Sequence, residues 1–253
     1  MKKAVLLILA FMAGSCSLIY EDRSGCPCLL TIDYGECNAH PIDTLQSILI
    51  GEDGDFDDST WIPAFGSADT TVEKGTYLLS VWGNGIMDES RRTIIPNARN
   101  ELYSFIQKLD CYDERRFVRI RPIPEFAETT VRILDKVGQI QEAEFSGCNS
   151  GFGFDKSMLS ESAVLELELT KEKEYFVSRT NLLRMKDIGT LNIRLTDGNR
   201  NFDYPVGHLL KENGYDMTED FLEPIEIIID TVLGEITVKT QDWETVESTD
   251  IIF

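Results

Sequence analysis

Four of the six cysteines in this chain of 253 residues lie between residues 16 and 37. The last three of them are closely followed by His40, and thiolates together with an imidazole could hold a zinc ion in a tetrahedral set. The spacing of Cys26, Cys28 and Cys37 differs from that of common zinc clusters, and exported thiols tend to oxidise. We therefore expect no metal site here.

Cys16 follows a segment that is typical of bacterial export. Two lysines precede an apolar run at residues 4–12, which is too short to span a bilayer, and small residues separate that run from Cys16. The arrangement resembles the lipobox of bacterial lipoproteins, in which the cysteine thiol receives diacylglycerol. We predict a lipoprotein signal peptide at residues 1–15 and a lipidated tether at 16–25. Ordinary signal cleavage with an unmodified Cys16 is the alternative.

The five other cysteines offer either disulfides or buried free thiols. Because their number is odd, at least one stays free, and the sequence does not determine the pairing. Two of them, at positions 26 and 28, are too close for an unstrained bond to each other. The five residues are Cys26, Cys28, Cys37, Cys111 and Cys148.

The acidic stretch at residues 52–59 has the alternating aspartates of a calcium loop. Asp58 stands where such a loop needs glycine, and Ala64 stands where it needs the bidentate glutamate. A solvated turn is therefore the favoured interpretation over a weak cation site.

No catalytic signature is complete. The serine of GCNSG (147–151) stands one place late for a nucleophile elbow, and GNGIMD (83–88) and GFGFDK (151–156) lack the third glycine of a dinucleotide loop. Only His40 and His208 could serve as imidazole bases, and His208 lies in a short apolar helical pattern that predicts a structural role. We expect no enzymatic activity and no cofactor.

The charge balance excludes several partners. The formal net charge of −20 becomes −22 when residues 1–15 are removed. Nucleic-acid binding and electrostatic attachment to anionic lipid both depend on Lys and Arg, so neither is expected. The predicted link to the membrane is the acyl chains.

Alternation of apolar and polar residues with period two predicts an all-β chain of short strands. Two helices are also predicted: residues 101–110 have four apolar side chains at helical spacing, and residues 205–214 run from a proline to a glycine. We place a domain boundary near residue 112, where the strand pattern lapses, and expect two antiparallel β-sandwiches at 26–112 and 113–253. No strong internal repeat is visible. The strand segments are 28–34, 76–83, 165–170, 190–198, 225–230 and 235–240.

Three segments resemble the FimB-type fimbrial anchor lipoproteins of Bacteroides-like bacteria. EDRSGCPCLLTIDY (21–34) is similar to the family's acidic stretch and Cys-Pro pair before the first strand. KGTYLLSVWGNG (74–85) is similar to the strand that closes the first core, and residues 206–246 resemble the C-terminal signature of a short helix and two strands.

The resemblance implies two transthyretin-like β-sandwich domains and a role without catalysis. The protein would sit on the outer membrane, facing the cell surface, where it would anchor the base of a type V pilus and limit fimbrial length. Its partners would be stalk or accessory fimbrial subunits, contacted by strand exchange, and it would be monomeric outside the pilus. Glu21 and Asp22 could act as a surface-export signal or simply be part of a solvated tether.

A lipid-anchored glycan-binding protein is the alternative function, and it would need an exposed aromatic platform. Trp82 and Trp243 lie in strands that we expect to be buried, which leaves Trp61. A hydrolase is the weakest hypothesis, because no nucleophile and base can be named.

Overall fold

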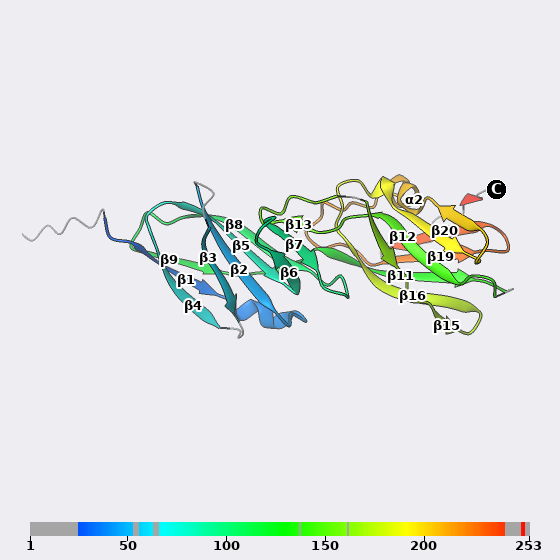
Figure 1. Cartoon of the computed structure of the whole chain (residues 1–253), viewed down its shortest axis with the longest axis horizontal. Coiled ribbons are helices and arrows are strands. Elements are labelled where there is room, and N and C mark those ends of the chain that lie inside the picture. Colours follow the sequence, from blue (N-terminus) through cyan, green and yellow to red (C-terminus); the bar gives the residue numbers. More distant parts are fainter. Residues whose placement is uncertain are drawn as a thin grey trace, which may run out of the picture.

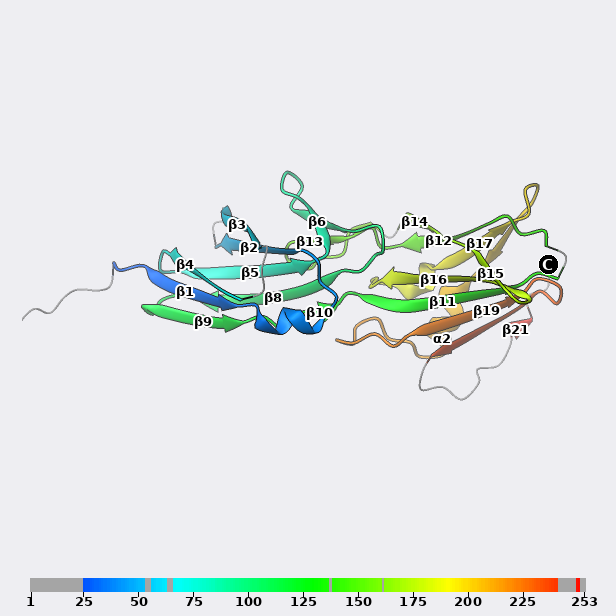
Figure 2. The same cartoon turned by 90° about the horizontal axis from the view of Figure 1, so that it is seen from below.

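A computed structural model describes residues 25–52, 56–62, 66–136, 138–160, 162–240 and 249–250. It consists of two β-sandwiches in series, arranged as an elongated molecule (Figures 1 and 2). The predicted all-β class is confirmed. Among the described residues, no helix is long and apolar enough to cross a membrane. Several residues named in the sequence predictions, or their side chains, lie outside the described part, so those predictions stay predictions. They are residues 1–24 with Cys16, Glu21 and Asp22, the acidic stretch 53–59, Trp61, Ala64 and Trp243.

The first sandwich packs a three-stranded sheet against a five-stranded sheet. The middle strand of the three-stranded sheet, β1 (Cys28–Asp33), buries alternate side chains, as its period-two sequence predicts. β5 is buried on both faces and carries the fully buried Trp82. The sheets are β4 (Ser67–Val72), β1 (Cys28–Asp33) and β9 (Arg115–Arg119), and then β10 (Ile123–Pro124), β8 (Tyr103–Asp110), β5 (Thr76–Gly83), β2 (Leu45–Gly51) and β3 (Phe56–Ile62); the 3-10 helix η1 (Gly35–Ala39) follows β1.

The second sandwich packs a six-stranded sheet against a four-stranded sheet. Residues 167–169 cross between the two sheets, so the predicted strand at 165–170 is divided into β14 and β15. The sheets are β15 (Thr170–Glu172), β16 (Tyr175–Leu183), β11 (Phe126–Leu134), β19 (Ile225–Asp230), β20 (Glu235–Thr240) and β21 (Thr249–Asp250), and then β14 (Ala163–Glu166), β12 (Glu142–Cys148), β17 (Asn192–Thr196) and β18 (Asn201–Tyr204); η2 (Ile188–Thr190) and α2 (Val206–Glu212) also belong here.

The two sandwiches share one strand topology. The order β4-β1-β9 in the first corresponds to β16-β11-β19 in the second, and β8-β5-β2-β3 corresponds to β18-β17-β12-β14. In both, the first strand pairs in parallel with the last strand of this set, β1 with β9 and β11 with β19, while the other pairs are antiparallel. The fold therefore contains a repeat that the sequence does not reveal.

Residues 101–110 do not form the predicted helix. They contain β8, which pairs with β5 along its whole length, from Tyr103 opposite Gly83 to Asp110 opposite Thr76. The apolar residues at helical spacing also supply both faces of a strand, because Phe105 and Leu109 lie on one face and Ile106 on the other. Long-range pairing therefore decides the structure of a segment whose local pattern is ambiguous.

The predicted boundary near residue 112 is also wrong. β9 pairs with β1, and Val118 and Ile120 are buried in the first core. The first core includes Phe126, and the second begins at Ala127. By contrast, the predicted helix at 205–214 is confirmed as α2, which ends before Gly214 at a φ of 78°.

Candidate functional site

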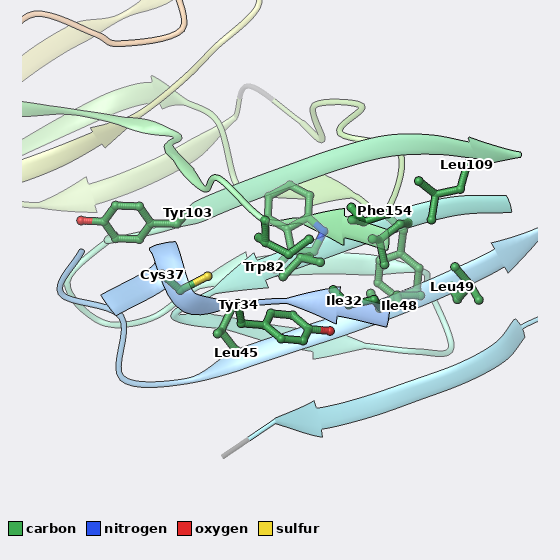
Figure 3. Close-up of a cluster of buried hydrophobic side chains, with 14 of the residues drawn as sticks. Ile32, Tyr34, Cys37, Leu45, Ile48, Leu49, Trp82, Tyr103, Leu109 and Phe154 are labelled. Carbon is green, nitrogen blue, oxygen red and sulfur yellow. The ribbon is translucent and has the colours of Figure 1, made fainter. Parts of the chain in front are cut away.

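A loop from the second sandwich covers part of the first core. The β13 loop (residues 149–160) lies between β12 and β14 in the chain, yet its strand β13 (Phe152–Gly153) pairs with β7 (Thr93–Pro96), which itself pairs with β6 (Gly85–Asp88). Phe152 packs on Trp82 with ring centroids 5.6 Å apart. Figure 3 shows Phe154 within the cluster that contains Trp82 and Ile48.

Hydrogen bonds hold the β13 loop in place. The Trp82 Nε1 donates to Ser80 Oγ at 2.7 Å, and Ser80 Oγ donates to the Phe154 carbonyl oxygen at 2.6 Å. A Cβ on Gly151, whose φ is 147°, would collide with the carbonyl oxygen of Ile94. The glycine motif GFGFDK thus lets two backbones approach each other and joins the sandwiches.

A buried ionic cluster lies beside this loop, and we call it the junction cluster: Glu125, Arg184, Lys156 and Ser104. Glu125 is 0% exposed. Its Oε2 accepts from Arg184 Nε at 2.8 Å, and its Oε1 lies 2.6 Å from Lys156 Nζ and accepts from Ser104 Oγ. The cluster draws its members from β8, the β10–β11 connection, the β13 loop and the residue after β16.

Arg184 completes the cluster with backbone contacts. Its guanidinium donates to the carbonyl oxygens of Met217, Glu219 and Asp220, and its backbone N–H donates to the Glu125 carbonyl oxygen at 2.8 Å. Taking a carboxylate and a guanidinium out of water is costly unless their hydrogen bonds are satisfied, as they are here. The junction therefore joins the sandwiches through ion pairs and hydrogen bonds with partners from both.

A cleft of about 570 Å³ borders the same junction. It is lined from the first sandwich by Arg99 and Glu101, and from the second by the facing parts of β11, β16 and the β14–β15 connection. Asn181 Nδ2 donates to the Arg99 carbonyl oxygen at 2.9 Å across it. Hydroxyl, carboxylate and guanidinium groups line this cleft.

The end of the molecule opposite β1 presents exposed apolar side chains. Val232 and Leu233, in the turn between β19 and β20, are 54% and 65% exposed. Their backbone N–H groups donate to Asp230 Oδ1, which holds the turn in shape. Figures 1 and 2 both place this turn at the far end from the start of β1.

The structure separates the predicted cysteine sites. Cys26 is exposed, whereas Cys28, Cys37, Cys111 and Cys148 are buried. Burial raises the pKa of the Cys148 thiol to about 12. Burial and then the charge of Asp33 raise that of Cys37 to about 11. Such thiols carry little thiolate at neutral pH and are poor nucleophiles.

The other predicted site residues lie apart from one another. His40 packs near the Tyr103 ring, with centroids 5.2 Å apart, and within the described ranges no group of three or more metal-ligating side chains is found. His208 is exposed and lies 3.2 Å from Glu212, so the helical face that it occupies is the solvent face. Trp82 is buried, as predicted.

The sequence patterns above do not single out the junction cluster. A signal was present, because Glu125 interrupts the segment PIPEFA (122–127) and Arg184 interrupts LLRM (182–185). Charged residues within apolar segments are almost never fully buried without a partner. Which charge meets which, across 59 positions of sequence, depends on the fold.

No family model and no curated protein matches the sequence. The fimbrial anchor protein Mfa2 from Porphyromonas gingivalis matches with a TM-score of 0.59 and 12% identity, over 86% of this chain and 98% of Mfa2. The chain has the fold of a fimbrial anchor protein.

Two further solved structures share this fimbrial-anchor fold. A candidate adhesin from Bacteroides ovatus matches with a TM-score of 0.61 and 11% identity, over 88% of this chain and 96% of its own. A candidate polysaccharide-binding protein from Bacteroides thetaiotaomicron matches with 0.58 and 12%, over 87% and 98%. The resemblance seen in the three sequence segments is thus confirmed as a likeness of fold over both sandwiches.

Proposed function

We propose that this protein is a surface lipoprotein that anchors the base of a type V pilus and limits its length. The observation that carries the proposal is the fimbrial-anchor fold, which covers 98% of Mfa2. A lipid on Cys16 holds the protein at the outer membrane, and the acidic polypeptide stays outside the bilayer. The role needs no catalysis.

The shape of the molecule supports this role. β1 begins at one end of the molecule, and the turn between β19 and β20, which contains the exposed Val232 and Leu233, lies at the other (Figure 1). Since the membrane occupies the first end, the stalk subunit joins at the second by adding a strand to a sheet edge near this turn.

Cys16→Ala tests the anchor, with Cys26→Ala as the matched control because Cys26 is exposed and lies in the same N-terminal region. We expect Cys16→Ala to release folded protein from the membrane, and Cys26→Ala protein to stay in the detergent-extracted fraction. Cys16→Ala protein that remains membrane-bound would contradict lipidation.

A photocrosslinking residue tests the contact with the stalk. Placed at Leu233, it should crosslink to a stalk subunit in pili isolated after mild solubilisation of the outer membrane. Placed at Tyr112, which is 58% exposed beside the start of β1, it should not. Equal crosslinking at both positions, or none to any fimbrial subunit, would overturn the proposal.

Glycan binding is a second candidate function, favoured by the cleft at the junction. Its lining of hydroxyls and carboxylates fits sugar hydroxyl groups. Binding of the native chain to a glycan on an array, with that binding lost in Arg99→Ala, would support this function. A native chain that binds no glycan on the array would contradict it.

A further inference from the structure

We propose that Cys28 and Cys111 form a disulfide that joins the two sheets of the first sandwich. The proposal rests on the export proposed above, because such bonds form in oxidising compartments. Both residues are free thiols in the structure; their side chains are 0% exposed and belong to the same core. The strand pairings place both residues at the same end of the first sandwich.

Strand pairing explains why these two residues meet. Cys28 is the first residue of β1 and pairs with Val72 of β4, while the next residue, Leu29, donates its N–H to the Glu114 carbonyl oxygen at 2.9 Å. Cys111 follows β8, and its N–H donates to the Gly75 carbonyl oxygen at 2.8 Å. Two short connections, at residues 73–75 and 111–114, therefore cross between the sheets at this end. Cys111 is the first residue of the second connection, and Cys28 begins β1 at the same end.

The other described cysteines are placed elsewhere. Cys37 lies in η1, which follows the opposite end of β1. At about 3.3 Å per residue, that end of the strand is roughly 16 Å from Cys28. Cys148 belongs to the second core. Cys26 is exposed outside the sandwich, so it is the competitor that an experiment must exclude.

The chemistry is thiol–disulfide exchange with an exported thiol oxidase. One thiolate of the pair attacks the oxidase disulfide to give a mixed disulfide, and the second thiolate then displaces the oxidase sulfur. Two S–H bonds are broken and one S–S bond forms, while the two electrons reduce the oxidase disulfide to a dithiol. Burial, and then the nearby Cys28, raise the pKa of Cys111 to about 11 in the folded chain, so the exchange takes place before the sandwich closes.

Peptide mapping tests the bond. The full chain is extracted from exporting cells in detergent, unfolded with iodoacetamide but without reductant, and digested with trypsin. We expect the peptides 24–74 and 109–115 to be joined. Cys26→Ser and Cys37→Ser should keep the joined pair, and Cys28→Ser should lose it. A native chain with both peptides free and alkylated, or a pair lost in Cys26→Ser, overturns the proposal.

Thermal unfolding with and without reductant gives a second readout. The disulfide would close the loop from Cys28 to Cys111. Closing so long a loop should stabilise the folded chain enough that reductant lowers Tm by roughly 10 °C. The double variant Cys28→Ser, Cys111→Ser should unfold at a temperature that reductant does not change, whereas Cys37→Ser should keep the shift. A native Tm that is insensitive to reductant counts against the bond.

Refolding of the purified reduced chain in a glutathione redox buffer separates the disulfide from export. If the disulfide between the two peptides forms on refolding but is absent from the chain isolated from cells, the pairing of Cys28 with Cys111 is supported and the proposed export is contradicted. A chain that is reduced under both conditions contradicts the disulfide itself.

Discussion

Glu125 organises the junction between the two sandwiches. Its two carboxylate oxygens meet a guanidinium, an ammonium and a hydroxyl, and its backbone N–H donates to Leu102 of the first sandwich while its carbonyl oxygen accepts from Arg184 of the second. A buried ion pair of this kind adds little stability relative to apolar residues that pack as well, but losing one partner leaves an unpaired buried charge. Its value here is positional, because it fixes one relative orientation of two domains.

Glu125→Gln should therefore destabilise the chain by about 3–5 kcal/mol, because Arg184 stays buried without its anion. Chemical denaturation of the purified protein measures the effect. The matched control is Glu172→Gln, which breaks an exposed pair with Arg179 and should change stability little.

A double variant separates charge from packing at the same site. Glu125→Leu combined with Arg184→Met should lose less stability than either single substitution, since the buried carboxylate and guanidinium are removed together and the remaining Lys156 ammonium is partly exposed to water. Equal losses for Glu125→Gln and for the exposed control would contradict the role of the junction cluster.

At the scale of elements, α2 shows how close packing determines a residue type. Gly207 is buried in the first turn of α2, and its N–H donates to the Leu191 carbonyl oxygen at 2.8 Å. A Cβ at this position would overlap the carbonyl oxygen of Ile188 in η2. Lys211 and Asp187, 3.0 Å apart, connect the same two elements at the surface.

Gly207→Ala should lower stability by about 1–3 kcal/mol, although alanine favours helices over glycine by about 1 kcal/mol. The helix must move away from η2 to accommodate the methyl group. Thermal unfolding measures the change, and Gly66→Ala is the control because no atom lies within 4 Å of a Cβ there. Higher stability of Gly207→Ala would mean that the contact between α2 and η2 is loose.

At the scale of the whole molecule, the two cores are interlocked rather than merely adjacent. The first core takes Phe152, Phe154 and Leu183 from segments that follow the beginning of the second sandwich. The β13 loop, which covers Trp82, therefore lies far in sequence from the strands of the first sandwich. The core of the N-terminal domain is therefore incomplete at either the predicted boundary or the observed one.

A fragment that ends at residue 126 should fail to fold, because it lacks the aromatic side chains that cover Trp82. With Trp61 and Trp243 replaced by Phe, the fluorescence of Trp82 should be shifted to longer wavelength in the fragment and to shorter wavelength in the full chain. Cooperative unfolding of the fragment with a buried Trp82 would contradict this.

The sequence by itself determined the class of fold, because period-two alternation is a local property: the core faces of β1, β17, β19 and β20 and the ends of α2 could be predicted from it. Likewise, the fimbrial-anchor fold was recognisable from three segments. Only the tertiary structure decided that residues 101–110 form a strand, that β9 belongs to the first sandwich and that one topology is used twice.

The sequence also did not predict that Glu125 meets Arg184, or that Cys28 and Cys111 lie at the same end of the first sandwich. Both depend on how the strands pair. The cysteine-rich stretch looked like one cluster along the chain, yet Cys28 meets a residue from the other sheet and Cys37 lies beyond the far end of β1. The reason is physical: local patterns report which face of an element is apolar, whereas pairing, burial of charge and contact between thiols depend on residues distant in sequence.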